Sequence, residues 1–158
     1  MEHDVRVVRQ YKILRYESAK HEYALKLFQE GVVNGVDLYP CGGFKDENLD
    51  FLLHLEKLRA VCIQSLPKIS LSLLEELSSL EYLTIDQETI ESTKFTLNFS
   101  KLSSLKSLAT TWHKKLFRNP ESANLESLYL WKYKPTSNNL TDFPQFNQLK
   151  LLDPRHSY

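Results

Sequence analysis

Short leucine-rich phrases recur along most of this chain at a nearly constant interval. Four clear copies of the template LxxLxL, and two degenerate ones, have these first positions: Val33, Leu58, Leu80, Leu105, Leu125 and Leu149. The steps between them are 25, 22, 25, 20 and 24 residues. In such a segment the first, fourth and sixth side chains point inward, so stacked copies share one apolar core. The pattern therefore predicts a row of parallel β-strands, each joined to the next by a crossover segment.

The segments between the phrases have an apolar periodicity of their own. Residues 45–55, 67–77 and 92–102 carry leucine and phenylalanine at helical spacing, and Pro67 suits a helix N-terminus. The shorter segments 113–120 and 138–146 contain proline and predict turns or single helical turns.

The first 30 residues lack the leucine phase. Residues 5–16 are rich in β-branched and aromatic side chains and predict one or two strands. Residues 18–31 predict a helix, with Ser18 as a candidate N-cap and Gly31 as a candidate C-cap. This segment is expected to close the end of the array, or else to form one further divergent repeat.

The phrases LSSLEYLTI and LSSLKSL resemble those of bacterial leucine-rich-repeat proteins, and the resemblance covers about residues 31–154. It implies one α/β domain over residues 1–158, a solenoid of about six irregular repeats behind an N-terminal cap at 1–30. Parallel strands would line its concave face, with helices or turns on the convex face. The asparagine that usually follows each strand is missing here, where Gln87, Trp112 and Tyr133 stand instead. A doubly wound α/β domain is the competing fold, because it also alternates strands and helices.

Composition and charge narrow the classes of function. Formal net charge is zero, but residues 44–100 hold 5 basic and 10 acidic groups while residues 101–158 hold 9 and 4. The molecule is therefore dipolar along its length, or simply has an uneven solvated surface. The chain starts without an apolar leader and has no run of 18 apolar residues, so we expect a cytoplasmic protein without a membrane partner. Cys41 and Cys62 are then expected to be reduced and half-buried in neighbouring strands.

The motifs of catalysis are missing from the sequence. It contains no phosphate-binding loop, no GxGxxG and no GxSxG, and its five histidines form no ligand pair. We therefore expect no enzyme, no catalytic residue, no metal and no cofactor, with His54 and His113 in solvated positions. The basic cluster from Trp112 to Arg118 could contact nucleic acid. We favour a solvated loop and expect no direct nucleic-acid binding.

The concave face is the strongest candidate for binding. Strand alternation places the third, fifth and seventh positions of each repeat on it. The candidate partner-binding residues are Asp37, Tyr39, Gln64, Tyr82, Thr84, Asp86, Thr111, Tyr129, Trp131, Asp153 and Arg155. Tyr, Trp and Arg dominate interface hot spots, which favours protein recognition, although the aromatic rings could instead pack on one another across strands.

Small leucine-rich-repeat proteins without a leader or anchor resemble the immunity proteins of bacterial polymorphic toxin and contact-dependent growth inhibition systems. The resemblance implies a tight complex with a toxin domain, for example a nuclease, whose basic surface would meet the acidic 44–100 half. The alternative is a leucine-rich-repeat adaptor or regulatory scaffold that recruits a protein target. A third class, an enzyme acting on nucleic acid, depends on the Trp112–Arg118 cluster alone.

Overall fold

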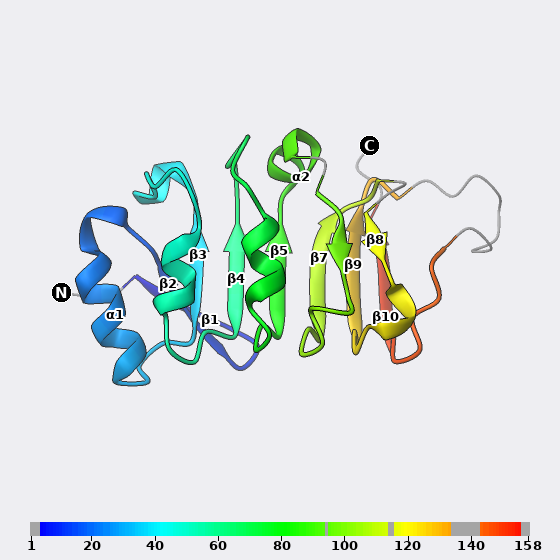
Figure 1. Ribbon diagram of the computed structural model, residues 1–158, viewed down its shortest axis with the longest axis horizontal. Helices are drawn as coiled ribbons and strands as arrows, with labels where there is room; N and C mark the ends of the chain where they lie inside the picture. Colours follow the sequence, from blue (N-terminus) through cyan, green and yellow to red (C-terminus); the bar gives the residue numbers. More distant parts are fainter. Residues whose placement is uncertain (1–3, 94, 114–115, 134–142, 156–158) are drawn as a thin grey trace.

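The computed structural model describes residues 4–93, 95–113, 116–133 and 143–155 (Figure 1). Within them the protein is mixed α/β, with few helices and a mostly parallel sheet of eight strands that does not close into a barrel. The sheet strands are β1 (Val5–Val8), β2 (Tyr11–Arg15), β3 (Gly35–Leu38), β4 (Ala60–Ile63), β5 (Tyr82–Ile85), β7 (Ser107–Thr111), β9 (Ser127–Trp131) and β10 (Leu151–Arg155). No helix in these ranges is long and apolar enough to cross a membrane.

The sheet follows the order of the chain, and every pair from β2 to β10 is parallel. A doubly wound sheet requires a reversal of strand order, and this sheet has none. The register brings the fourth positions of the sequence template into one row: Val36, Val61, Leu83, Leu108, Leu128 and Leu152. All but the last are fully buried. The predicted leucine phase therefore sets the core of the sheet.

The crossovers differ from the helices predicted for residues 45–55 and 67–77. The structure has only 3₁₀ turns there, at Asp50–His54 and Ser72–Glu76, and Pro67 starts no helix. Leu49, Leu52 and Leu55 are buried, whereas Leu53 is 49% exposed. Burial at every third residue matches the three residues per turn of a 3₁₀ helix, so the predicted α-helical period was wrong.

The third crossover is also corrected. Its helix is α2 (Gln87–Thr93), which overlaps the predicted segment 92–102 only at residues 92–93, and β6 (Leu97–Asn98) lies inside that segment. β6 pairs in parallel with β8 (Phe117–Arg118) to form a second ladder, so residues 113–120 are not turn alone; a further 3₁₀ turn begins there (Pro120–Ser122). Residues 138–142 of the last predicted turn lie outside the described part of the chain.

Trp112 and His113 are not in a solvated loop. The Trp112 ring packs edge-on against Tyr133 at 5.0 Å and against Phe117 at 5.8 Å between ring centroids. His113 Nε2 lies 3.1 Å from the Phe95 carbonyl oxygen, and burial lowers the pKa of this histidine. The cluster read as a possible nucleic-acid contact is thus partly a packing unit, and Lys114 and Lys115 lie outside the described residues.

The N-terminal helix, α1 (His21–Gln29), is shorter than predicted. Ser18 lies in a separate 3₁₀ turn (Ser18–Lys20), and its hydroxyl accepts a hydrogen bond from the Lys45 amide, so it is not the N-cap of α1. Gly31 does follow the helix with a φ of 70°, the left-handed conformation that ends helices. β2 pairs with β3 in the same parallel register as the later strands, and the remaining 3₁₀ turn, Pro40–Gly42, follows β3.

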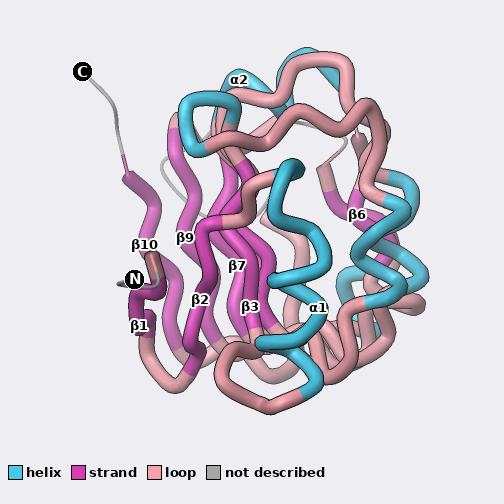
Figure 2. Tube along the Cα trace, turned by 90° about the vertical axis from the view of Figure 1, so that its left-hand side faces the viewer, coloured by secondary structure: helices cyan, strands magenta, loops and turns pink. Residues whose placement is uncertain are grey.

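The first strand lies on the opposite side of the sheet from α1 and the 3₁₀ turns. β1 pairs antiparallel with β2. Figure 2 shows the helical crossovers on one side of the row of strands and β1 on the other. Val8 packs against Ile13, Ala60 and Cys62, in a small apolar cluster separate from the main core. We call the side that carries β1 the open face.

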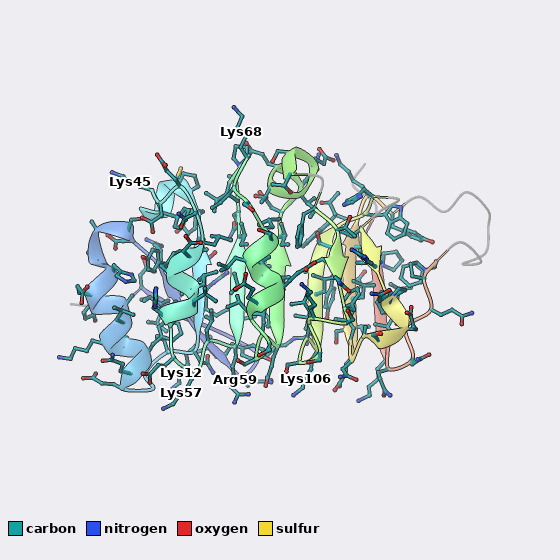
Figure 3. All side chains as sticks on the ribbon, in the orientation of Figure 1. Lys12, Lys45, Lys57, Arg59, Lys68 and Lys106 are labelled. Atoms are coloured by element: carbon teal, nitrogen blue, oxygen red, sulfur yellow. The ribbon has the colours of Figure 1, made fainter. Side chains whose placement is uncertain are left out.

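A column of charged side chains crosses the strands where they begin. The second template positions are Asn34, Arg59, Glu81, Lys106, Glu126 and Lys150, so the charges alternate in sign. Glu81 forms ion pairs with Arg59 and with Lys106 Nζ at 3.8 Å, and Lys150 Nζ lies 2.9 Å from a Glu126 oxygen. Figure 3 shows Arg59 and Lys106 along this edge. If two neighbouring inner strands, such as β5 and β7, exchanged places, like charges would lie side by side. The column of charges therefore favours the observed strand order.

A buried threonine occupies a core position that is apolar in the neighbouring strands. Thr110 is fully buried, and its hydroxyl has no hydrogen-bond partner among the described residues. We expect Thr110→Val to raise the free energy of unfolding by about 1 kcal/mol or more, because an unpaired buried hydroxyl is removed at nearly constant volume. Urea denaturation measures it.

Thr89 provides the matched control for this substitution. It is also fully buried, but its Oγ1 accepts the Leu66 amide at 3.0 Å. Thr89→Val should therefore lower stability by about 1–3 kcal/mol. Equal effects of the two substitutions would contradict the assignment of an unsatisfied hydroxyl at Thr110.

Candidate functional site

The open face presents three rows of side chains, set by the strand register. The third template positions form the row where the strands begin: Gly35, Ala60, Tyr82, Ser107, Ser127 and Leu151. The seventh template positions form the row that ends the strands: Tyr39, Gln64, Asp86, Thr111 and Trp131. The fifth positions are Asp37, Cys62, Thr84, Ala109, Tyr129 and Asp153. β7 contributes only small side chains to this face, while its neighbours contribute Tyr82 and Trp131. β7 therefore offers less side-chain bulk on this face than its neighbours do.

β1 and the start of β2 cover part of this face and contact three of the predicted binding residues. Arg6 Nη2 lies 2.8 Å from an Asp37 carboxylate oxygen. Arg9 Nη2 donates to the Tyr129 hydroxyl at 3.0 Å, and its guanidinium lies 5.8 Å from the centre of that ring. The Tyr11 ring lies 5.4 Å from the Tyr82 ring, and the Tyr11 hydroxyl donates to Glu81. The predicted face is thus partly occupied by the chain itself.

Asp37 is not the exposed acidic point that the sequence suggested. Only 7% of the residue is exposed, and its carboxylate accepts the Gln64 amide at 2.8 Å as well as binding Arg6. Burial raises the pKa of Asp37 above its usual 3.8, and Arg6 and Gln64 oppose that rise. Asp37 is therefore paired with Arg6 and Gln64 and largely covered on the open face.

The raised pKa of Asp37 gives a testable pH dependence. A carboxyl group with a raised folded-state pKa contributes stability at low pH that is lost as the pH rises above 3.8. Arg6→Gln removes the largest cause that lowers the pKa, so we expect the Asp37 pKa to rise further, measured by carboxyl-carbon NMR titration. Arg15→Gln should move it less, because Arg15 acts more weakly on Asp37. An unchanged Asp37 pKa in Arg6→Gln would show that the ion pair does not form.

A cavity of about 410 Å³ lies on the open face, between β1 and the strands β4, β5, β7 and β9. Arg6 and Val8 line it from β1, and Trp131 lines it from β9. Cys62, Thr84 and Thr111 line it from the sheet, and Gln64, Asp86 and Gln87 from the ends of the strands. The volume falls in the range of natural ligand pockets, which combine apolar walls with a few polar groups.

The other predicted residues fall into two groups. Gln64, Tyr82, Thr84, Asp86, Thr111 and Trp131 all line the cavity, although Thr111 is only 1% exposed. Tyr39 lies outside it, with the Arg15 guanidinium 5.8 Å from its ring centre. Asp153 is half-buried on β10, and the side chain of Arg155 lies outside the described part of the chain.

Four residues that contact the open face or line its cavity were not among the predicted binding residues. Arg6, Val8 and Arg9 come from a segment predicted only as strand, and Gln87 comes from the first turn of α2. One available signal was the segment VRVVR at residues 5–9, which places two arginines among the valines of a β-branched strand. Arg9 also has a φ of 55°, an uncommon conformation for a residue other than glycine.

The cysteines differ from the prediction of two half-buried thiols in neighbouring strands. Cys41 is exposed in the 3₁₀ turn after β3, and Cys62 is buried in β4 beneath the cavity; both are free. Burial raises the pKa of the Cys62 thiol. At neutral pH Cys62 is therefore a protonated, weakly polar part of the cavity wall.

In the described ranges, no group of three or more His, Cys, Asp or Glu side chains is arranged to hold a metal ion. The site offers aromatic rings, hydrogen-bonding groups and ion pairs on a rigid sheet. Comparison of the chain with protein-family models, curated proteins and solved structures found no match.

Proposed function

We propose that this chain is a leucine-rich-repeat solenoid that binds another protein with its open face. The observation that carries the proposal is the cavity of about 410 Å³, which is walled by Trp131 and Tyr82 and rimmed by Gln64, Asp86 and Gln87. Aromatic side chains next to hydrogen-bonding groups, held on a sheet, are typical of interface hot spots. The in-phase parallel strands and one-sided crossovers support the solenoid.

We further propose that the partner is a bacterial toxin domain, such as a nuclease, and that the chain is its cytoplasmic immunity protein. The dipolar charge of the sequence supports a charged partner, because the acidic 44–100 half can orient a basic surface on approach. An adaptor that recruits a protein target would use the same face, but its binding would not silence a toxin.

Co-expression tests this proposal most directly. The chain is expressed together with the product of the neighbouring upstream reading frame, and cell survival and co-purification are measured. Rescue of growth together with a stable complex supports the immunity function. A complex without rescue supports the adaptor. If the two proteins form no complex and growth is not rescued, the proposed function is wrong.

Variants on each side of the sheet test whether the open face is the surface that binds the partner. Tyr129→Ala with Trp131→Ala changes the open face, and Tyr23→Ala with Leu53→Ala changes the side that carries α1 and the 3₁₀ turns. Binding should fail only for the first pair. Equal loss for both pairs would mean that the open face is not the binding surface.

A further inference from the structure

The chain places its own arginines on the aromatic rings and carboxylates of the open face. Arg15 lies over the Tyr39 ring and Arg9 over the Tyr129 ring, each with 5.8 Å from guanidinium carbon to ring centre. Arg6 pairs with Asp37 at 2.8 Å. Three arginines from β1, β2 and the turn between them thus occupy two tyrosines and one aspartate. The face is chemically suited to guanidinium groups.

Trp131 and Asp86 offer the same two kinds of group and lack such a partner. Both line the cavity. In the part of the chain that the structure describes, no arginine or lysine lies over the Trp131 ring and none forms an ion pair with Asp86. The pair therefore repeats the chemistry already used around Asp37 and Tyr129, but with the cavity in place of an arginine.

The strand register gives this pair a suitable separation. Asp86 follows β5 and Trp131 ends β9, with β7 between them, so their backbones lie about 10 Å apart at the usual strand spacing. Between them β7 presents Thr111, a small side chain that lines the cavity. One extended side chain entering over Thr111 can therefore contact the ring on one side and the carboxylate on the other.

The surrounding charges favour a cation. The Asp86 carboxylate accepts the Ser65 amide at 2.9 Å and the Thr89 amide at 3.0 Å, so these bonds fix its position at the edge of the cavity. The adjoining helix α2 adds Glu88 and Glu91, of which Glu91 pairs with Lys132 at 3.3 Å. Arg6, the cation that lines the cavity, is already neutralised by Asp37. The local balance is therefore negative.

We propose that this cavity binds an arginine side chain of the partner, which stacks on Trp131 and pairs with Asp86; the identification of a protein partner rests on the proposed function. Arginine fits better than lysine, because its planar guanidinium stacks on an indole ring and donates in parallel to a carboxylate. The partner surface that meets the open face is accordingly basic at this point.

An NMR titration with N-acetyl-argininamide tests the site without the partner. We expect saturable shifts of the Trp131 indole N–H and of the Asp86 and Thr111 amides at millimolar probe. N-acetyl-citrullinamide, which has nearly the same shape but no charge, should bind about tenfold more weakly. The arginine probe should also bind about tenfold more weakly to the Trp131→Leu protein. Trp131→Phe retains an aromatic face and should stay within about threefold of the unchanged protein.

Two further variants separate charge from fold. Asp86→Asn should weaken the arginine probe about tenfold, whereas Asp50→Asn, on the opposite side of the sheet, should leave it unchanged. Urea denaturation of each variant reports whether it remains folded. Equal binding of the citrulline and arginine probes, or shifts that avoid Trp131 and Asp86, would overturn the arginine site.

The outcomes distinguish this inference from the proposed function. If the toxin complex forms and depends on Trp131 but the arginine probe does not bind, protein binding stands and the arginine site falls. If the probe binds and no complex with the upstream product forms, the site stands and the immunity function falls.

Discussion

Replacing Leu108 by alanine should lower the free energy of unfolding by about 2–5 kcal/mol, the range for a buried leucine in a packed core. Leu108 is fully buried on β7, between Leu83 on β5 and Leu128 on β9. Both neighbouring strands are held by backbone hydrogen bonds, so the sheet cannot collapse easily into the cavity that the lost methyl groups leave. Urea denaturation followed by circular dichroism measures the change.

Leu53 provides a control with the same chemical change. It lies in the 3₁₀ turn Asp50–His54 and is 49% exposed. Leu53→Ala should change the stability by less than about 1 kcal/mol, because little apolar surface returns to water. Because domains of this size are stable by only about 5–15 kcal/mol, the loss at Leu108 is a large share of the total. Equal effects at the two sites would contradict a core built from the fourth template positions.

The strands were predictable because their apolar side chains repeat in a phase that stacking alone explains. The strand positions derived from Leu58, Leu80, Leu105 and Leu125 coincide with β4, β5, β7 and β9. Each strand buries its fourth position against the next strand, so a local pattern in the sequence carries information about the tertiary register.

The crossovers were not predicted correctly because a period of three and a period of 3.6 are hard to separate over ten residues. Leu71, Leu74 and Leu77 recur at every third position, and the Leu74 and Leu77 amides donate to the carbonyls three residues earlier at 3.0 and 3.2 Å. This spacing is that of a 3₁₀ helix. The half-buried Leu73 suggested an α-helical stripe that the chain does not form.

The turn after β4 satisfies two backbone amides without an asparagine side chain. After β4 the backbone amides of Ser65 and Leu66 donate to the side chains of Asp86 and Thr89. These two residues lie close to Gln87, one of the positions at which the resemblance implied an asparagine. Aspartate and threonine side chains accept these amide bonds, so the turn is satisfied without an asparagine.

The position of β1 could not be derived from its sequence. The β-branched segment VRVVR predicts a strand, but the face it covers depends on contacts such as that between Arg9 and Tyr129, 120 residues apart in the chain. The same contact changes the candidate site, because it places Arg9 on a residue predicted to be available to a partner. The rows of side chains on the open face follow from the spacing of the repeats. The cavity also requires the hairpin formed by β1 and β2, because Arg6 and Val8 of β1 line it.

Substituting both Tyr129 and Trp131 by alanine should weaken the proposed protein complex by about 2–4 kcal/mol, or roughly 30-fold to 1,000-fold in dissociation constant. Both rings lie on the open face, and Trp131 lines the cavity. Removing them takes away a large apolar contact and the surface on which a guanidinium can stack. Calorimetric titration with the co-purified partner measures the dissociation constant.

Two comparisons identify the cause of that loss. Tyr129→Ala also releases Arg9, so a shift of the hairpin could imitate a lost contact. Arg9→Ala breaks the same internal contact while keeping both rings, and should weaken the complex far less than the double substitution. Tyr23→Ala, on α1 at the opposite side of the sheet, should have no effect. If Arg9→Ala weakens binding as much as the double variant does, the hairpin rather than the aromatic pair is the binding element, because the rings are unchanged in that protein.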